Sequence, residues 1–223
     1  MMKKIKTGRL ELSLMSDEQL AELVQRADEP DLRAAYAQML ALCREHPQER
    51  HWYAPWQIAL KTSGVPVGDL GFKGPPADGA VEIGYGVEES HRCRGYATEA
   101  CQALIEWAFV QENVYVVEAE TAADNEISQR VLQKLGFRAC GLGAEGPRFE
   151  KEKPASGWLA IYMCLGMSVG MCFGVSTANT ALGMCLGTCF GMMIGAAMDA
   201  AEKKKRAALR TRRTGLVADK QEE

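Results

Sequence analysis

The 223-residue sequence has few of the residues that build metal sites. It holds three histidines and eight cysteines, and neither a C-x-x-C nor an H-E-x-x-H motif occurs among them. Zinc sites use such closely spaced ligands, so we expect no metal centre. The N-terminal residues also lack the continuous apolar segment of a signal peptide, which predicts a globular part that stays in the cytosol with reduced thiols.

An excess of basic charge is missing as well. The 26 Lys and Arg residues are outnumbered by 29 Asp and Glu residues, which gives a net charge of −3 at pH 7. Proteins that bind nucleic acid generally carry a basic surface, so nucleic acid is not an expected partner. The 47% of hydrophobic residues are enough for a buried core, which excludes a wholly disordered chain.

The charged residues divide the chain into three regions. Residues 158–198 contain no Asp, Glu, Lys, Arg or His, although 25% of the whole chain is charged. Residues 1–157 are acidic on balance, whereas eight basic residues outnumber five acidic ones in residues 199–223. We therefore expect a globular domain over residues 7–153, an apolar segment over 158–198 and a basic polar tail over 199–223.

Periodic patterns in the first region predict an α+β fold, with one mixed sheet flanked by helices. Alternating apolar residues predict strands over 9–15, 52–60, 65–72, 81–87, 114–121 and 148–153. Helical spacing predicts helices that begin at Ser16 or Asp17, at Asp31, near Ala97 and at Asp124-Asn125. The last of these should end at Gly136. Its expected inner face is Ile127, Val131, Leu132 and Leu135.

The strand over residues 81–87 carries two glycines on one face. Glu82, Gly84 and Gly86 alternate with apolar residues and therefore share a side of the strand. Glycine weakens a strand and often marks a place where a ligand or another backbone comes close. This face is therefore either a ligand-binding surface or a site of tight packing.

The loop after this strand has the composition of an anion site. It reads Arg92-Cys93-Arg94-Gly95-Tyr96 and opens a helix near Ala97. Backbone N–H groups at a helix N-terminus and the helix dipole attract anions, and the two arginines add positive charge. The spacing matches neither G-x-x-x-x-G-K-[ST] nor G-x-G-x-x-G. We predict a phosphate or pyrophosphate site outside those two nucleotide-binding classes.

Two motifs in this order resemble the GNAT family of N-acetyltransferases, in particular the branch that acetylates ribosomal-protein N-termini and small amines. One is R-x-x-G-x-A-T-E-A from Arg92, and the other is N-x-x-S-x-x-V-L-x-K-x-G-F from Asn125. The resemblance covers about residues 7–153. It implies acetyl-CoA as co-substrate and, as acceptor, the amine of a protein N-terminus or a small molecule. The acetyl-CoA-binding residues that it implies are Tyr85, Gly86, Val87, Arg92, Cys93, Arg94, Gly95, Tyr96, Ala97, Thr98 and Asn125.

The same resemblance implies direct attack of a neutral amine on a thioester. Such a reaction needs a base for the amine and a proton for the leaving thiolate. Glu82 is the candidate base, and its alternative role is a solvated or structural carboxylate. Ser128 is the candidate donor to sulfur, unless its hydroxyl bonds only to its own helix. Many family members have a tyrosine seven residues after Asn125, where this sequence has Leu132.

The apolar region has glycine at every fourth position in two runs. Its two halves, 158–175 and 181–198, would each span about 27 Å as helices, close to the bilayer core. Glycine every four residues lets helices pack closely in lipid. We predict a glycine-zipper transmembrane hairpin, which also favours homo-oligomers. A single tilted or interfacial helix and a glycine-rich core of a soluble protein are the alternatives.

Lys and Arg residues precede and follow this segment, which predicts that both of its ends face the cytoplasm. The sequence therefore predicts an N-acetyltransferase at the cytoplasmic membrane, with its catalytic domain and both termini in the cytoplasm. The alternative is a membrane-assembly or pore-forming protein whose GNAT-like domain binds CoA or a partner without turnover. A third possibility is that the two regions work separately.

Overall fold

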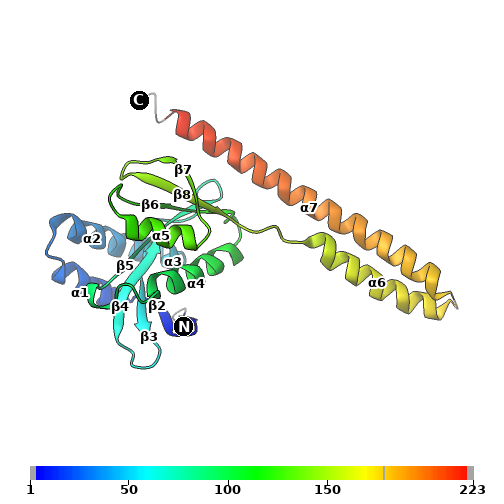
Figure 1. The fold of residues 1–223 in the computed structure, drawn as a ribbon, viewed down its shortest axis with the longest axis horizontal. Coiled ribbons are helices and arrows are strands. Elements are labelled where there is room, and N and C mark those ends of the chain that lie inside the picture. Colours follow the sequence, from blue (N-terminus) through cyan, green and yellow to red (C-terminus); the bar gives the residue numbers. More distant parts are fainter. Residues whose placement is uncertain (1–3, 178, 220–223) are drawn as a thin grey trace. The chain divides into compact units, whose positions relative to one another are not determined.

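The computed structural model describes residues 4–177 and 179–219 (Figure 1). It divides the chain into two compact units that meet between Lys153 and Pro154.

The first unit contains an eight-stranded sheet in the order β1-β2-β3-β4-β5-β6-β8-β7. The strands are β1 (Lys4–Lys6), β2 (Leu10–Leu14), β3 (Trp56–Leu60), β4 (Pro66–Phe72), β5 (Ala80–Val87), β6 (Val116–Glu120), β7 (Arg138–Leu142) and β8 (Pro147–Glu152). Every neighbouring pair is antiparallel except β5 and β6, which are parallel. The mixed sheet that the sequence predicts is thus confirmed.

Five α-helices and one 3-10 turn accompany this sheet. They are α1 (Asp17–Arg26), α2 (Pro30–Glu45), α3 (Arg50–Tyr53), η1 (Glu89–His91), α4 (Tyr96–Val110) and α5 (Glu126–Lys134). One face of α4 is buried, as its helical spacing of apolar residues requires, and this helix contacts β2, β5, β6 and α5. Ser16 caps α1 in a reciprocal capping box with Gln19. Gly136 follows α5 with a φ of 82°, as expected for a glycine that ends a helix.

One predicted strand boundary is wrong, and one short strand was missed. The strand expected over 52–60 begins only at Trp56, because residues 50–53 form the short helix α3. Trp52 on α3 instead packs against the rings of Phe72 and Trp107. Strand β1 was not predicted, since three residues are too short for a pattern.

Two helix details also differ from the prediction. Helix α2 begins at Pro30 after Glu29, which suits proline because its missing N–H has no partner in the first turn. The side chain of Asp31, the expected cap, lies outside the described residues. Ile127, expected on the inner face of α5, is 61% exposed, whereas Leu132 on the same helix is buried.

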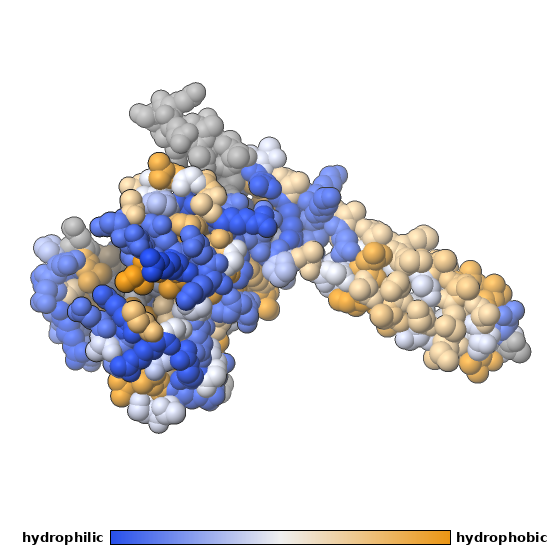
Figure 2. Space-filling model, in the orientation of Figure 1, coloured by the Kyte–Doolittle hydropathy of each residue, from blue (hydrophilic) through white to orange (hydrophobic). Residues whose placement is uncertain are grey.

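The second unit is a pair of packed helices, α6 (Trp158–Ser176) and α7 (Thr180–Asp219). Its glycines face the partner helix: a Cβ on Gly183 would lie 2.6 Å from Gly174 Cα, and one on Gly187 would lie 2.7 Å from Gly170 Cα. Most large apolar side chains point outward and are exposed, as the hydropathy colouring of Figure 2 illustrates. The glycines are thus used within one chain, so an oligomer contact would have to use the outer surface.

Both helices are long and apolar enough to cross a membrane. The second helix continues beyond the apolar segment to Asp219, so it includes most of the basic stretch that follows residue 198. Residues 199–219 are rich in Ala, Lys, Arg and Leu, all strong helix formers, which favours continuation over a separate tail. Residue 178 of the predicted turn and residues 220–223 of the predicted tail lie outside the described residues.

The open end of the helix pair is held by polar contacts. The carboxylate of Asp199 on α7 accepts hydrogen bonds from the backbone N–H groups of Trp158 and Leu159, both at 3.1 Å. Glu202 accepts from Ser156, from the indole N–H of Trp158 at 3.1 Å, and from Arg206. These carboxylates satisfy the free donors at the start of α6, which fixes that helix against α7.

Candidate functional site

Strands β5 and β6 separate after a short parallel contact. Ala80–Glu82 pair with Val116–Glu118, whereas residues 83–87 of β5 pair with β4 alone. Among the residues that the structure describes, no strand pairs with the backbone of β5 from Ile83 to Val87 on its β6 side. Such an edge offers N–H and C=O groups to an extended ligand in the manner of a missing strand.

The loop that follows β5 contains two residues with positive φ. Cys93 has a φ of 60° and Gly95, which caps α4, has a φ of 78°. Left-handed residues next to a helix start bring successive N–H groups together into a concave anion site. The Nε of Arg92 donates to the carbonyl of Val87 at 3.1 Å, which ties the loop to the end of β5. The predicted anion loop therefore lies directly beside the free strand edge.

Arg9, which the sequence did not single out, anchors this loop from the position just before β2. Its guanidinium donates to the carbonyl of Arg94 at 3.0 Å and to the carboxylate of Glu99 at 2.7 Å. It also lies 4.9 Å from the ring centre of Tyr96. Glu99 accepts two further hydrogen bonds, from the hydroxyl of Thr7 at 2.6 Å and the N–H of Arg9 at 2.8 Å. No local pattern could reveal a contact between residues 90 positions apart.

Helix α5 brings Asn125 and Ser128 toward β5. Asn125 caps the helix by accepting from the N–H of Ser128 at 3.0 Å. The hydroxyl of Tyr85 lies 2.7 Å from the hydroxyl of Ser128 and donates to its carbonyl at 3.2 Å. Burial raises the pKa of Tyr85 to about 12, although the hydrogen bond to Ser128 works against that rise. Tyr85 therefore stays protonated and holds the Ser128 hydroxyl within reach of β5.

The predicted base Glu82 belongs to a network of ion pairs centred on Lys73. Its carboxylate lies 2.6 Å from the ammonium of Lys73, which is also 3.1 Å from Glu145. Burial disfavours the charged lysine, but the hydrogen bonds to Glu82 and Glu145 outweigh it, so the pKa of Lys73 is raised. Glu82 is thus placed on the glycine-bearing face of β5, with a permanent cation beside it.

The two carboxylates that neighbour Glu82 on β6 have structural partners. Glu118 is buried and forms an ion pair with Arg148. Glu120 accepts hydrogen bonds from the backbone N–H groups of Glu145 and Gly146. These contacts use both side chains to hold the β7–β8 region, so neither is available in the way that Glu82 is.

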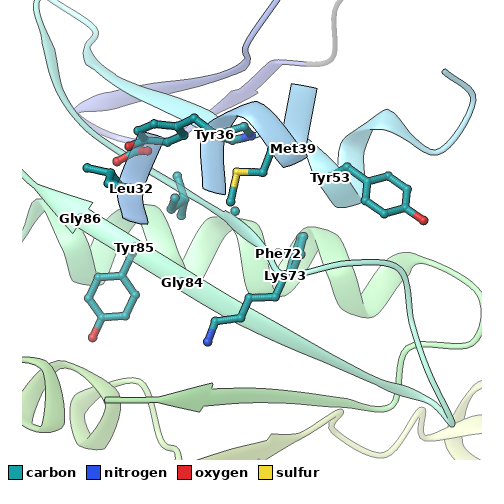
Figure 3. A pocket seen from close by; sticks show the side chains of 13 residues that line it. Leu32, Tyr36, Met39, Tyr53, Phe72, Lys73, Gly84, Tyr85 and Gly86 are labelled. Atoms are coloured by element: carbon teal, nitrogen blue, oxygen red, sulfur yellow. The ribbon is translucent and has the colours of Figure 1, made fainter. Parts of the chain in front are cut away.

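A cavity of about 200 Å³ lies on the other side of β5 from the hydroxyl of Tyr85. Figure 3 shows side chains of α2 above the strand and Tyr85 pointing away from them. The lining residues are Leu32, Tyr36, Met39, Tyr53, Pro55, Asp69, Leu70, Gly71, Phe72, Lys73, Gly84, Tyr85 and Gly86. A Cβ on Gly84 would meet no atom within 4 Å, so of the two alternatives for this face of β5, a ligand surface or tight packing, the open space at Gly84 favours the first.

Residues 7–138 match the family described as acetyltransferase (GNAT) domain. The uncharacterized N-acetyltransferase YjdG of Bacillus subtilis is 45% identical over 83 residues, which are 37% of this chain and 49% of that protein. This chain thus spans about half the length of the curated relatives it matches.

Solved structures share the fold of the first unit. An acetyltransferase from Agrobacterium tumefaciens is similar with a TM-score of 0.55 and 22% identity, over 68% of this chain and 95% of that one. A ribosomal L7/L12 α-N-protein acetyltransferase in complex with coenzyme A has a TM-score of 0.54 and 17% identity, over 67% of this chain and 98% of that one. The family match ends at residue 138, so it does not include the second unit.

Proposed function

The chain belongs to the GNAT acetyltransferase family, and from that premise we propose that it transfers an acetyl group from acetyl-CoA to a primary amine. The observation that carries the proposal is the free edge of β5 running directly into an anion loop. The first feature suits an extended pantetheine arm and the second suits a pyrophosphate.

The proposed acetyl-CoA site follows from these two features. The backbone of Tyr85, Gly86 and Val87 would hold the arm, because these residues lack a strand partner on the β6 side. The backbone amides from Arg92 to Thr98 would hold the pyrophosphate, supported by the positive end of α4. Asn125 would contribute its amide N–H₂ group, since its carbonyl oxygen already caps α5.

When bound, acetyl-CoA supplies a thioester whose carbonyl carbon forms a C–N bond with the amine as its C–S bond breaks and the thiolate leaves. Glu82 accepts the proton that the amine loses, directly or through water, while Lys73 balances its charge. Ser128 donates its hydroxyl proton to the departing sulfur and is reprotonated from solvent. Tyr85 lies 2.7 Å from that hydroxyl and holds it in place, whereas position 132, where many family members have a tyrosine, is leucine here.

We further propose that helices α6 and α7 form a membrane anchor. Their length and outward apolar side chains support it, as does the placement of the basic stretch after residue 202. Both ends of the pair, and with them the catalytic domain, would then face the cytoplasm, where acetyl-CoA is found. A homo-oligomer would form through the outer apolar surface of the pair.

The catalytic proposal is tested with the full-length protein in detergent, acetyl-CoA and a panel of primary amines, by following thiol release. We expect turnover that Glu82→Gln lowers by about 10²–10⁴-fold in kcat/KM. Glu22→Gln, on the exposed side of α1, is the control. A kcat/KM that Glu82→Gln leaves unchanged across the pH range would remove Glu82 as base. Acetyl-CoA binding with no turnover on any amine would favour a non-catalytic role for the domain.

The anchor proposal is tested by labelling introduced cysteines in vesicles, in a background without the native cysteines of α6 and α7. Ala155→Cys and Ala208→Cys should react with an impermeant thiol reagent from the same side. Thr177→Cys, between the helices, should react from the opposite side. Labelling of all three positions from one side would instead indicate a hairpin that lies at the membrane surface.

A further inference from the structure

The cavity on the glycine-bearing face of β5 contains a carboxylate with no cation. Asp69 on β4 is the register partner of Gly86 on β5, so both residues lie on this face. A Cβ on Gly86 would lie 3.5 Å from the Oδ1 of Asp69. Because glycine has no side chain there, the carboxylate oxygen borders open space rather than a neighbouring side chain.

The partners of Asp69 leave its negative charge unbalanced. Tyr36 on α2 forms a side-chain hydrogen bond with it. The cationic residue of the lining, Lys73, forms its ion pairs with Glu82 and Glu145. Within residues 4–177 and 179–219, no Lys, Arg or His side chain forms an ion pair with Asp69. Burial raises the pKa of Asp69 despite the hydrogen bond from Tyr36.

The remaining walls of the cavity are mostly apolar. Leu32 and Met39 come from α2, Tyr53 from α3 and Phe72 from β4. A protein cavity of about 150 Å³ takes a molecule of the size of benzene. A volume of about 200 Å³ therefore suits one compact apolar group together with a polar end.

We propose that this cavity is selective for a primary ammonium next to a compact apolar group, and that Asp69 is the residue that binds the ammonium. This inference rests on the proposed acetyltransferase function, since it names the acceptor class of the same site. Asp69 supplies the missing counter-charge through a charge-assisted hydrogen bond. Gly86 leaves the space for the nitrogen, and the apolar walls receive the substituent. A free amine and the first residue of a peptide both offer this chemistry.

The test measures acceptor binding separately from turnover. Full-length protein in non-ionic detergent is titrated by calorimetry with 2-phenylethylamine, with putrescine, and with a short peptide that begins with phenylalanine. Acetylation of each compound is then followed with acetyl-CoA. We expect 2-phenylethylamine or the peptide to bind, and putrescine to bind at least tenfold more weakly. Tighter binding of 2-phenylethylamine would indicate a free amine as acceptor, and tighter binding of the peptide would indicate a protein N-terminus.

Asp69→Asn should raise the Kd and the KM for the preferred acceptor by about ten- to one-hundredfold, and leave the KM for acetyl-CoA unchanged. Asp28→Asn, an exposed position, is the matched control. A second variant, Met39→Ala, keeps the carboxylate and enlarges the cavity. It should shift the ratio of kcat/KM values toward 4-phenylbutylamine over 2-phenylethylamine.

Three results would overturn the inference: an acceptor Kd that Asp69→Asn leaves unchanged, a preference for putrescine, or no change of size preference in Met39→Ala. Binding of the apolar amine without acetylation would keep the cavity assignment and refute the transferase. Acetylation that is insensitive to Asp69→Asn would keep the transferase and refute the cavity assignment. The two failures are therefore distinguishable.

Discussion

Replacing Glu99 by glutamine should loosen the anion loop and weaken acetyl-CoA binding. The carboxylate of Glu99 accepts from Thr7 at 2.6 Å, and from the N–H and the Nε of Arg9 at 2.8 and 2.7 Å. Arg9 in turn donates to the carbonyl of Arg94 within the loop. Glutamine has one acceptor oxygen, so one of the present donors would face the amide N–H₂ group instead. The loop would then lose the group that orients Arg9.

The size of the effect follows from the number and exposure of these bonds. A hydrogen bond to a charged group contributes about 1.5–3 kcal/mol to stability. The side chain of Glu99 is 20% exposed but that of Arg9 is 53% exposed, so solvent screening reduces the Arg9 contribution. We expect Glu99→Gln to lower the free energy of unfolding by about 1–2 kcal/mol. For a unit of this size the Tm should fall by roughly 2–8 °C.

The assay combines thermal unfolding of the full chain in detergent with titration of acetyl-CoA. The Kd for acetyl-CoA should rise ~3–10-fold, because the variant must order its loop on binding. Glu106→Gln, an exposed position on the same helix, should change neither quantity. A variant Tm within about 1 °C of wild type together with an unchanged Kd would refute the role given to Arg9 and Glu99.

The pH dependence gives an independent check on Glu99. Burial opposes its ionisation, but the hydrogen bonds from Thr7 and Arg9 outweigh burial, so the pKa of Glu99 is below its ordinary value of 4.5. A lowered pKa means that this stabilisation is present above the unfolded-state value and is lost as the pH falls through the folded-state value. The difference in stability between wild type and Glu99→Gln should therefore shrink below pH 4.5.

Three further predictions address the hairpin, the loop and the proton donor. Gly183→Leu should force α6 and α7 apart, because a Cβ at this position would lie 2.6 Å from a backbone atom of α6. Spin-label distances between the two helices should then lengthen, whereas the exposed control Met171→Leu should leave them unchanged. Arg92→Ala should raise the Kd for acetyl-CoA ~3–10-fold and reduce its salt dependence, and an unchanged Kd would place the pyrophosphate elsewhere. Ser128→Ala should lower kcat by about tenfold or more, and Tyr85→Phe should lower it by less. The Kd for acetyl-CoA of both variants should stay within about twofold of wild type. An equal kcat for wild type and the two variants would exclude Ser128 as the proton donor.

Local patterns were enough to predict most elements of the first unit. The strand predicted over residues 81–87 and the helix predicted near residue 97 are both present in the structure. Each of these segments buries one face against a single core, which is why its local pattern was informative. The failures occurred where tertiary packing outweighed the local pattern. Trp52 lies on a short helix instead of a strand and packs against other aromatic rings, and Ile127 is exposed at the surface.

The second unit shows a different balance. The spacing of its glycines predicted two closely packed helices, and the structure places those glycines against each other. What the spacing did not determine is whether glycine contacts join helices of one chain or of two. The structure joins them within the chain, and Asp199 and Glu202 hold the open end.

The sequence by itself pointed to the family and predicted the anion loop, because both depend on residues close together in the chain: Arg92, Gly95 and the glycines of β5. Only the tertiary structure could decide what surrounds them. Strand pairing placed Asp69 beside Gly86, and helix packing brought Ser128 to Tyr85. Such contacts depend on strand register and helix docking, which the whole core sets at once and no short segment encodes.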